Sequence, residues 1–213
     1  MRKTLLSLAA APALVALAGL ALTSLAPGSW IADWAPCPRN WGWGPAWKPR
    51  ASPLEALAFE LGESGHGKLC YGRPSLRGRV MLGSPAVPFG RLWRTGANEP
   101  TTLHLDAPAR IADLHLAPGS YSIYTVPDAV AWEVVVNRST RQWGLESEYT
   151  DEVRAREVGR FRVPVEVLES PVETLTFRAV PTAAGAVVLV LEWQTTRIRM
   201  PLDAELAVEP PSD

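Results

Sequence analysis

From about residue 54 onward, apolar and polar residues alternate in short segments separated by glycine and proline. This two-residue period is typical of β-strands that bury one face. In the segment 101–106 it places Leu103 and Leu105 on the same face. Six further strands are predicted from the same pattern, at 120–126, 132–136, 161–167, 172–180, 185–193 and 195–202.

The predicted strand 195–202 shows the alternation between core and solvent most clearly. In 195–202, Ile198 and Met200 are expected to face the core while Arg197 and Arg199 face solvent. The breaks at 183–185 and 194–195 resemble hairpin connections. About nine strands at regular spacing predict an all-β fold, an antiparallel β-sandwich or jelly-roll-like domain. No helix longer than two turns is predicted there, although the irregular stretch 146–153 has room for one short turn.

The N-terminus has a different pattern. Arg2 and Lys3 precede an uncharged, largely apolar run over residues 4–30. A hydrophobic helix over the apolar part of this run would span about 30 Å, enough to cross a membrane. The basic residues at its start predict that everything after it is exported, to the periplasm or another extracytoplasmic space.

Two fates of this segment are compatible with the sequence. Cleavage as a signal peptide would use the small-x-small site at residues 16–18. Retention as an anchor over residues 5–26 is favoured by the length of the run, and by Trp30 and Trp34, which suit a membrane interface. We therefore divide the chain into a signal peptide or anchor (1–28), a Trp/Pro-rich linker (29–52), a β-sandwich domain (53–205) and a tail (206–213).

The linker holds five of the nine tryptophans, between Trp30 and Trp47. They could stack on a sugar or peptide, but no polar residues converge around them, which favours contact with the membrane interface or with an edge of the domain. Cys37 lies in the same linker, and Cys70 is the second and last cysteine. In an oxidising compartment the two could form a disulfide, and two free thiols are the alternative.

Composition limits the function further. Hydrophobic residues make up 47% of the chain, enough for a packed core, and the formal charge of −1 has both signs interspersed. A nucleic-acid binder would need a clustered basic surface, so nucleic acid is not an expected partner. The sequence contains no G-x-S-x-G, P-loop, G-x-G-x-x-G or H-E-x-x-H motif. His104 and His115 are placed on neighbouring strands, where Asp106 or Asp113 could complete a metal site, but histidines in such positions are more often surface residues. We predict no metal and no cofactor, and assign no catalytic residue.

The most distinctive region is 71–102, which contains five arginines among glycines and prolines. It reads Y-G-R-P-S, then G-R, then W-R-T-G-A-N-E. With further matches at 118–122, 132–137, 142–144 and 191–193, the chain resembles the bacterial family called domain of unknown function 2911 over roughly residues 51–203. The resemblance implies an exported β-rich domain and no particular activity. Pro100 departs from the small residue usual in that pattern.

Long loops on β scaffolds often carry binding groups, so this region is the candidate site. Guanidinium groups suit a carboxylate or phosphate, tryptophan offers a stacking face, and asparagine offers a paired donor and acceptor. Such a site would bind a small anionic or glycan ligand. The candidate ligand-binding residues are Arg73, Arg79, Trp93, Arg94, Asn98 and Glu99. In the alternative interpretation, Glu99 pairs with Arg94 or Arg73 and the network only pins the loop to the domain.

We therefore expect an exported cell-envelope domain that acts as a non-catalytic binding or scaffold module. One alternative is a hydrolase of envelope glycans or esters, for which Glu99, Glu133 and Glu192 are the candidate carboxylates. The other alternative is a structural subunit of a membrane complex that binds an envelope protein through the linker.

Overall fold

The computed structural model describes Cys37 and residues 50–182 and 185–205. The predicted N-terminal helix, most of the linker and the tail lie outside these residues. Among the described residues, none of the helices has the length and apolar character needed to cross a membrane.

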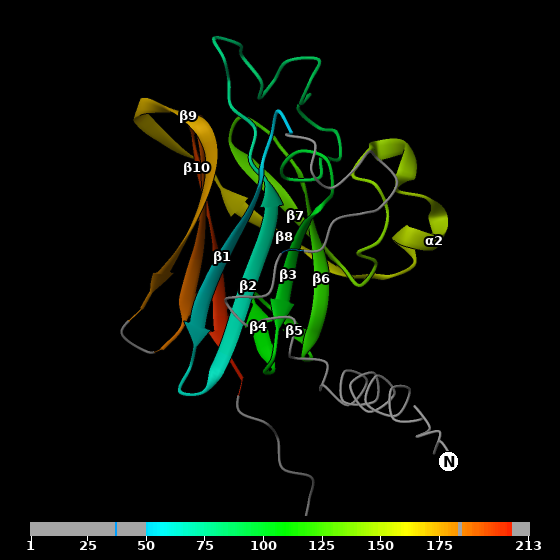
Figure 1. Cartoon of the computed structure of the whole chain (residues 1–213), viewed down its shortest axis with the longest axis vertical. Helices are drawn as coiled ribbons and strands as arrows, with labels where there is room; N and C mark the ends of the chain where they lie inside the picture. Colours follow the sequence, from blue (N-terminus) through cyan, green and yellow to red (C-terminus); the bar gives the residue numbers. More distant parts are fainter. Residues whose placement is uncertain (1–36, 38–49, 183–184, 206–213) are drawn as a thin grey trace, which may run out of the picture.

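In the described part of the chain, ten strands form two antiparallel sheets, which confirms the all-β prediction (Figure 1). The large sheet has the order β1-β2-β3-β6-β7-β8 and the small sheet the order β5-β4-β10-β9. The strands are β1 (Leu54–Leu61), β2 (Gly65–Gly72), β3 (Thr101–Leu105), β4 (Ala109–Ile111), β5 (Leu114–Leu116), β6 (Gly119–Val126), β7 (Ala131–Asn137), β8 (Glu157–Pro164), β9 (Glu166–Pro181) and β10 (Val187–Ala204).

The two sheets share one hydrophobic core. Alternate residues of the large sheet, such as Leu103 and Ile123, are buried with alternate residues of the small sheet, such as Leu191 and Ile198. Leu103 and Leu191 have no exposed surface. The face of the large sheet that turns away from this core is called the outer face below.

The predicted hairpin at 194–195 is wrong, because β10 runs through it as one strand. The pairing of β10 with β9 shifts register on both sides of Gln194, which has a φ of 54°. The irregularity is therefore a β-bulge, which bends a strand without ending it. The side chain of Gln194 explains the bulge, because its Oε1 accepts hydrogen bonds from the backbone N–H groups of Met81 and Leu82.

The connection between β7 and β8 packs across part of the outer face. It contains a 3-10 turn at Glu146–Glu148 and the helix α2 (Asp151–Arg154), which confirms the predicted short turn. Figure 1 shows α2 on the side of the large sheet away from β9 and β10. A small second core lies beneath it, formed by Tyr124 and Val135 of the sheet and Tyr149 and Val153 of the connection.

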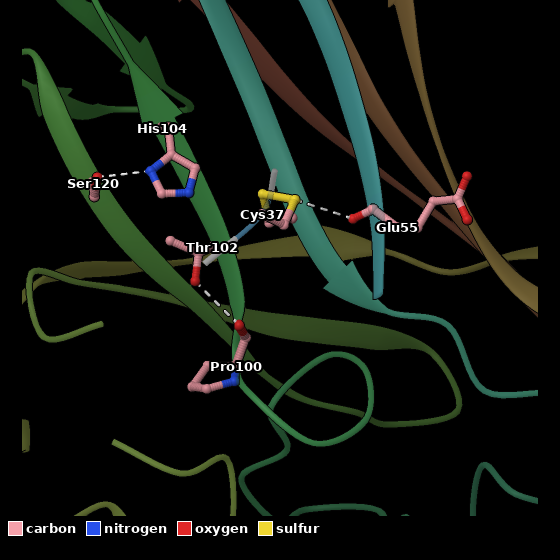
Figure 2. The surroundings of a disulfide bond; sticks show 7 residues. Cys37, Glu55, Pro100, Thr102, His104 and Ser120 are labelled. Carbon is pink, nitrogen blue, oxygen red and sulfur yellow. Dashed lines mark hydrogen bonds between the residues drawn. A yellow bond between two sulfur atoms is a disulfide. The ribbon is translucent and has the colours of Figure 1, made fainter. Parts of the chain in front are cut away.

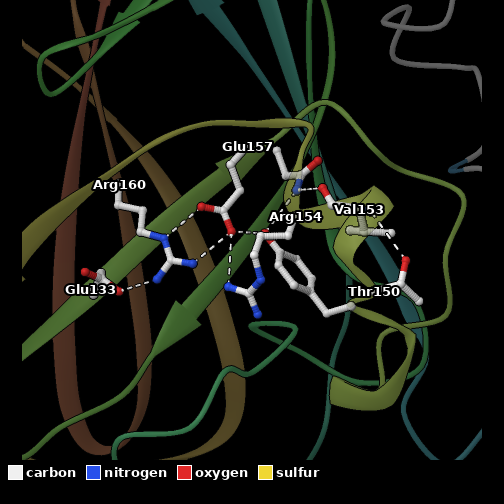
Figure 3. A network of polar contacts seen from close by, with 8 residues as sticks. Glu133, Thr150, Val153, Arg154, Glu157 and Arg160 are labelled. Carbon is white, nitrogen blue, oxygen red and sulfur yellow. Dashed lines mark hydrogen bonds and ion pairs between the residues drawn. The ribbon is translucent and has the colours of Figure 1, made fainter.

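Polar contacts fasten this connection to the sheet (Figure 3). Asn137 Nδ2 donates hydrogen bonds to Tyr149 Oη and to the Val153 carbonyl, and Tyr149 Oη donates to Glu157. Arg160 donates to both oxygens of Glu157, which lowers the pKa of that carboxyl. Burial raises the pKa of the Tyr149 hydroxyl above its usual range.

Candidate ligand site on the outer face of the large sheet

The structure distributes the six predicted site residues over several places. Arg73 donates hydrogen bonds from Nε to the Leu175 carbonyl and from Nη2 to Thr176 Oγ1, so it ties its loop to β9. Arg79 donates to the carbonyls of Leu76 and Ser75 within its own turn. Both guanidinium groups therefore bond to neighbouring parts of the fold.

Trp93 lies in the main core, 8% exposed. Its ring stacks on Trp193 at 5.7 Å between centroids and meets Trp132 edge-on at 5.9 Å. Its Nε1 donates to the Gly96 carbonyl, which shapes the turn after it. Trp93 is thus a packing residue and presents no stacking face to a ligand.

Asn98 and Glu99 hold the segment at which the domain begins. Glu99 is 6% exposed, and its two oxygens receive Arg50 Nη1 at 2.6 Å and Nη2 at 2.9 Å. Asn98 Nδ2 donates to the Ser52 carbonyl at 3.2 Å, and Arg77 Nη2 donates to the Ala51 carbonyl at 2.8 Å. The alternative interpretation was right that Glu99 pins the loop, but it named the wrong arginine. Arg50 lies outside the motif, so spacing within the motif could not reveal it.

Arg94 differs from the other arginines of the cluster. Trp93 forms a bridge with Thr125 of β6 and points into the core, so Arg94 follows on the opposite side, the side of Tyr124. Its Nη1 makes one long hydrogen bond, 3.5 Å, to the Asn98 carbonyl. Its Nε is buried and has no hydrogen-bond partner among the described residues.

The surroundings of Arg94 perturb its charge. Burial lowers the pKa of the Arg94 guanidinium, and the charges of Tyr124 and Glu99 act in the opposite direction. Burial also raises the pKa of the Tyr124 hydroxyl to about 12, so this hydroxyl stays protonated. The Arg94 guanidinium is therefore a half-buried cation beside the neutral hydroxyl of Tyr124.

Gly144 shows how closely the β7–β8 connection approaches Arg94. A Cβ atom at Gly144 would overlap Arg94 Cδ and the Asn98 carbonyl oxygen, so only glycine leaves room for the arginine stem. Gln142, two residues earlier, donates from Nε2 to Tyr124 Oη at 3.1 Å. Within residues 142–144, which carry part of the family resemblance, Gly144 therefore packs against the Arg94 stem and Gln142 bonds to the Tyr124 hydroxyl.

A polar row, buried at Lys68 and His104 and exposed at Ser120, crosses the same face of the large sheet. Lys68 of β2 pairs with His104 of β3, and His104 pairs with Ser120 of β6. His104 is 5% exposed, its Nδ1 lies 2.7 Å from Ser120 Oγ, and its Nε2 has no partner among the described residues. Burial, with a further contribution from Lys68, lowers the pKa of His104 to about 4.

Sequence reasoning took His104 for a surface residue and placed it on a strand next to that of His115, which in fact lies on β5 of the other sheet. The available signal was Cys70, two residues after Lys68 on the same strand. Figure 2 shows the disulfide that joins Cys70 to Cys37 on the side where the His104 side chain lies. The disulfide places Cys37 against this part of the outer face.

Cys37 and Cys70 form a disulfide, so the alternative of two free thiols is not what the structure contains. The Cα atoms of Cys37 and Cys70 are 5.6 Å apart, within the range of ordinary disulfides. Cys37 Sγ also lies 3.5 Å from the Glu55 carbonyl oxygen of β1. The bridge therefore attaches a linker residue to the edge of the large sheet.

Acidic side chains do not converge at this site. Glu133 pairs with Arg160, and Glu192 accepts from Arg178 and Arg197 on the far face of the small sheet. Among the described residues, no group of three or more His, Cys, Asp or Glu side chains could hold a metal ion. What the site offers chemically is a cationic hydrogen-bond donor with polar neutral groups around it.

Fold and site together define an all-β domain with a half-buried arginine on the outer face of its larger sheet. The chain belongs to the family described as protein of unknown function (DUF2911), whose model matches residues 52–202. This match confirms the resemblance seen in the loop motif. No curated protein and no solved structure matches the chain.

Proposed function

We propose that this chain is a non-catalytic binding module that takes a small ligand through a carboxylate or phosphate group at Arg94. One observation carries the proposal: the Nε of Arg94 is buried and has no hydrogen-bond partner among the described residues. Arg73 and Arg79 each donate from Nε to a backbone carbonyl, whereas the hydrogen bond of the Arg94 guanidinium is a long one of 3.5 Å from Nη1 to the Asn98 carbonyl.

The energetics favour a ligand at this place. A buried donor without a partner destabilises a protein by about 1–3 kcal/mol. A carboxylate or phosphate can accept from Nε and an Nη group of one guanidinium together, a planar two-point contact that also neutralises the charge. Arg94 is partly exposed as a residue, whereas its Nε is covered, so a ligand that accepts from Nε must displace the atoms that cover it.

Neighbouring groups would orient the rest of the ligand. Tyr124 and Gln142 supply polar contacts beside the guanidinium, and Trp143 follows directly in the chain.

We further propose that the two sheets form a sandwich and that the domain acts outside the cytoplasm. The shared core of both sheets supports the sandwich. The Cys37–Cys70 disulfide supports an oxidising compartment, in line with the apolar N-terminus of the sequence, which we take to target or anchor the chain at a membrane.

A hydrolase is less well supported. A general acid or base must exchange a proton with the substrate, yet Glu99, Glu133 and Glu192 are all bound to arginines, and Glu99 and Glu192 are buried as well.

The test is a thermal-shift and calorimetric titration of the full chain in a non-ionic detergent. The ligands are phosphate, monocarboxylates, dicarboxylates and phosphorylated sugars, with neutral sugars for comparison. A ligand at a hundred times its dissociation constant stabilises the folded state by about 2.7 kcal/mol.

We expect anions to stabilise the wild type and Arg94→Gln to abolish the effect. Arg94→Lys, which keeps the charge but loses the planar fork, should retain weakened binding. Arg79→Gln is the matched control, because it removes an arginine of the same loop that bonds only to its own turn. The proposal is refuted if no anion shifts the melting temperature, or if Arg94→Gln responds as the wild type does.

A further inference from the structure

We propose that the Cys37–Cys70 disulfide is a redox-sensitive clasp, whose reduction opens the part of the outer face around His104 to solvent while both hydrophobic cores stay folded. The inference is independent of the proposed ligand at Arg94, because it concerns a different place on the same sheet. It rests on a group of buried side chains, on the disulfide attached to that group, and on how the start of the domain is held.

A strip of buried side chains lies on the outer face of β2 and β3. The strip consists of Lys68, Cys70, Thr102 and His104. These residues occupy alternate positions in two paired strands, and Leu69 and Leu103 between them point into the main core. None of the four strip residues is more than 7% exposed. Outward-facing residues of an antiparallel sheet are commonly solvated, so the burial of this strip needs a cause.

The burial is local. Ala56 and Ala58 of β1, which pair with Cys70 and Lys68, are exposed on one side of the strip. Ser120 of β6, which pairs with His104, is exposed on the other side. The strip is therefore closed to solvent between neighbours that are open to it.

The disulfide is attached within this strip. Cys70 is one of its members, and Figure 2 shows Cys37 on the side of the sheet where the His104 side chain lies. Cys37 comes from the linker and also has its Sγ 3.5 Å from the Glu55 carbonyl oxygen of β1. A covalent bond thus holds a residue from outside the domain against the strip.

Release of Cys37 should leave the domain folded. Cys70 belongs to neither hydrophobic core of the described residues. The start of the domain has attachments of its own, because Arg50 donates two hydrogen bonds to Glu99 and the Ala51 carbonyl accepts from Arg77. Opening of the disulfide is therefore expected to act on the strip and not on the sandwich.

The closed arrangement also has a cost that opening removes. His104 Nε2 is buried and has no hydrogen-bond partner among the described residues. A buried polar atom in this state destabilises a protein by about 1–3 kcal/mol. Water would satisfy this nitrogen in the open arrangement, and Lys68 and Thr102 are polar side chains that water also solvates.

The proposed reaction is thiol–disulfide exchange with a dithiol reductant. One thiolate of the reductant attacks Cys37 Sγ, because Cys37 is partly exposed and Cys70 is buried. A mixed disulfide forms at Cys37, and Cys70 leaves as a thiolate. The second thiol of the reductant then displaces Cys37, so that the reductant leaves as a disulfide and its two protons end on Cys37 and Cys70.

The experiment compares the oxidised full chain with the chain reduced by dithiothreitol, both in a non-ionic detergent. The ring C–H resonances of the histidines are followed by NMR between pH 7.5 and pH 5, and His104→Gln identifies the resonance of His104. In the oxidised protein, with a His104 pKa of about 4, this resonance should stay nearly constant. In the reduced protein the pKa should rise toward about 6.5, the value of a solvated histidine, so the resonance should move.

The groups around His104 define the controls. Lys68 is the charged residue that faces it from β2, and Ser120, which faces it from β6, does not ionise in this range. The exposed His66 and His115 should show no effect of reduction. Cys37→Ser should behave as the reduced wild type does, with or without dithiothreitol.

A second measurement separates opening from unfolding. Tryptophan fluorescence and near-UV circular dichroism report the packing of Trp93, Trp132 and Trp193, and these signals should not change on reduction. Mass spectrometry after treatment with an amine reagent should show faster labelling of Lys68 in the reduced protein. The inference is overturned if the reduced, folded protein keeps the His104 titration of the oxidised one. Loss of the tryptophan signals on reduction would overturn it too, and so would a disulfide that dithiothreitol does not reduce in the folded protein.

Discussion

His104 is buried in its neutral form, and this makes the stability of the domain depend on pH in the acid range. Its imidazole is 5% exposed, lies opposite Lys68 and has a folded-state pKa of about 4. In the unfolded chain a histidine has a pKa of about 6.5. Between these two values the unfolded state binds a proton that the folded state does not bind.

The contribution of neutral His104 to the free energy of unfolding changes between these two pKa values. The stabilisation from neutral His104 is complete above about pH 6.5, decreases as the pH falls, and is lost below about pH 4. At about 1.36 kcal/mol for each pH unit, the total is about 3 kcal/mol, of which about 2 kcal/mol is lost by pH 5. Acidic side chains titrate in the same range, so the contribution of His104 must be obtained as a difference between variants.

The assay is urea unfolding followed by tryptophan fluorescence at pH values from 7.5 down to 4.5, for the wild type and His104→Gln. The wild type should lose about 2 kcal/mol more than the variant between pH 7 and pH 5. His115→Gln, which removes an exposed histidine on β5, is the control for a histidine substitution elsewhere. Parallel stability profiles for the wild type and His104→Gln would refute the burial of a neutral histidine at this position.

Three further predictions test the packing, the disulfide and the network beside α2. Trp93→Ala should lower the free energy of unfolding by about 3–5 kcal/mol, measured by chemical denaturation, and a loss below 1 kcal/mol would contradict its place in the core. Cys37→Ser should lower it by about 3.5 to 4 kcal/mol through loss of the chain restraint, seen as a lower melting temperature that a reducing agent no longer changes. Glu157→Gln should cost about 1–3 kcal/mol by weakening the contacts of Tyr149 and Arg160, and hydrogen exchange should show faster opening of α2, whereas unchanged exchange would contradict the network.

The strand pattern was predictable wherever burial alternated strictly. The inward Ile198 and Met200 and the outward Arg197 and Arg199 were all assigned correctly, because a two-residue period follows from the pleat of a strand whatever its partners are. The bulge at Gln194 was not predictable. A polar residue between two apolar runs is typical of a turn, and only the contacts of its side chain with Met81 and Leu82 show why the strand continues.

The candidate site was predictable as a region and not as a set of contacts. The loop that contains Arg94 was identified, yet Trp93 packs in the core and Glu99 binds Arg50. An ion pair between residues 49 positions apart depends on where the chain folds back on itself. The spacing of residues within a motif does not reveal that. The buried row through His104 was missed for the same reason, since outward-facing polar residues on a strand are normally solvated.

Periodicity, composition and motifs are local properties that each segment carries alone, and they were enough to predict the class of fold, the cysteines available for a disulfide and the family. Which arginine of the loop has a buried Nε without a partner, and which arginine pairs with Glu99, became known from the folded chain. These pairings depend on which groups are buried together, because a buried charge without a partner is strongly unfavourable.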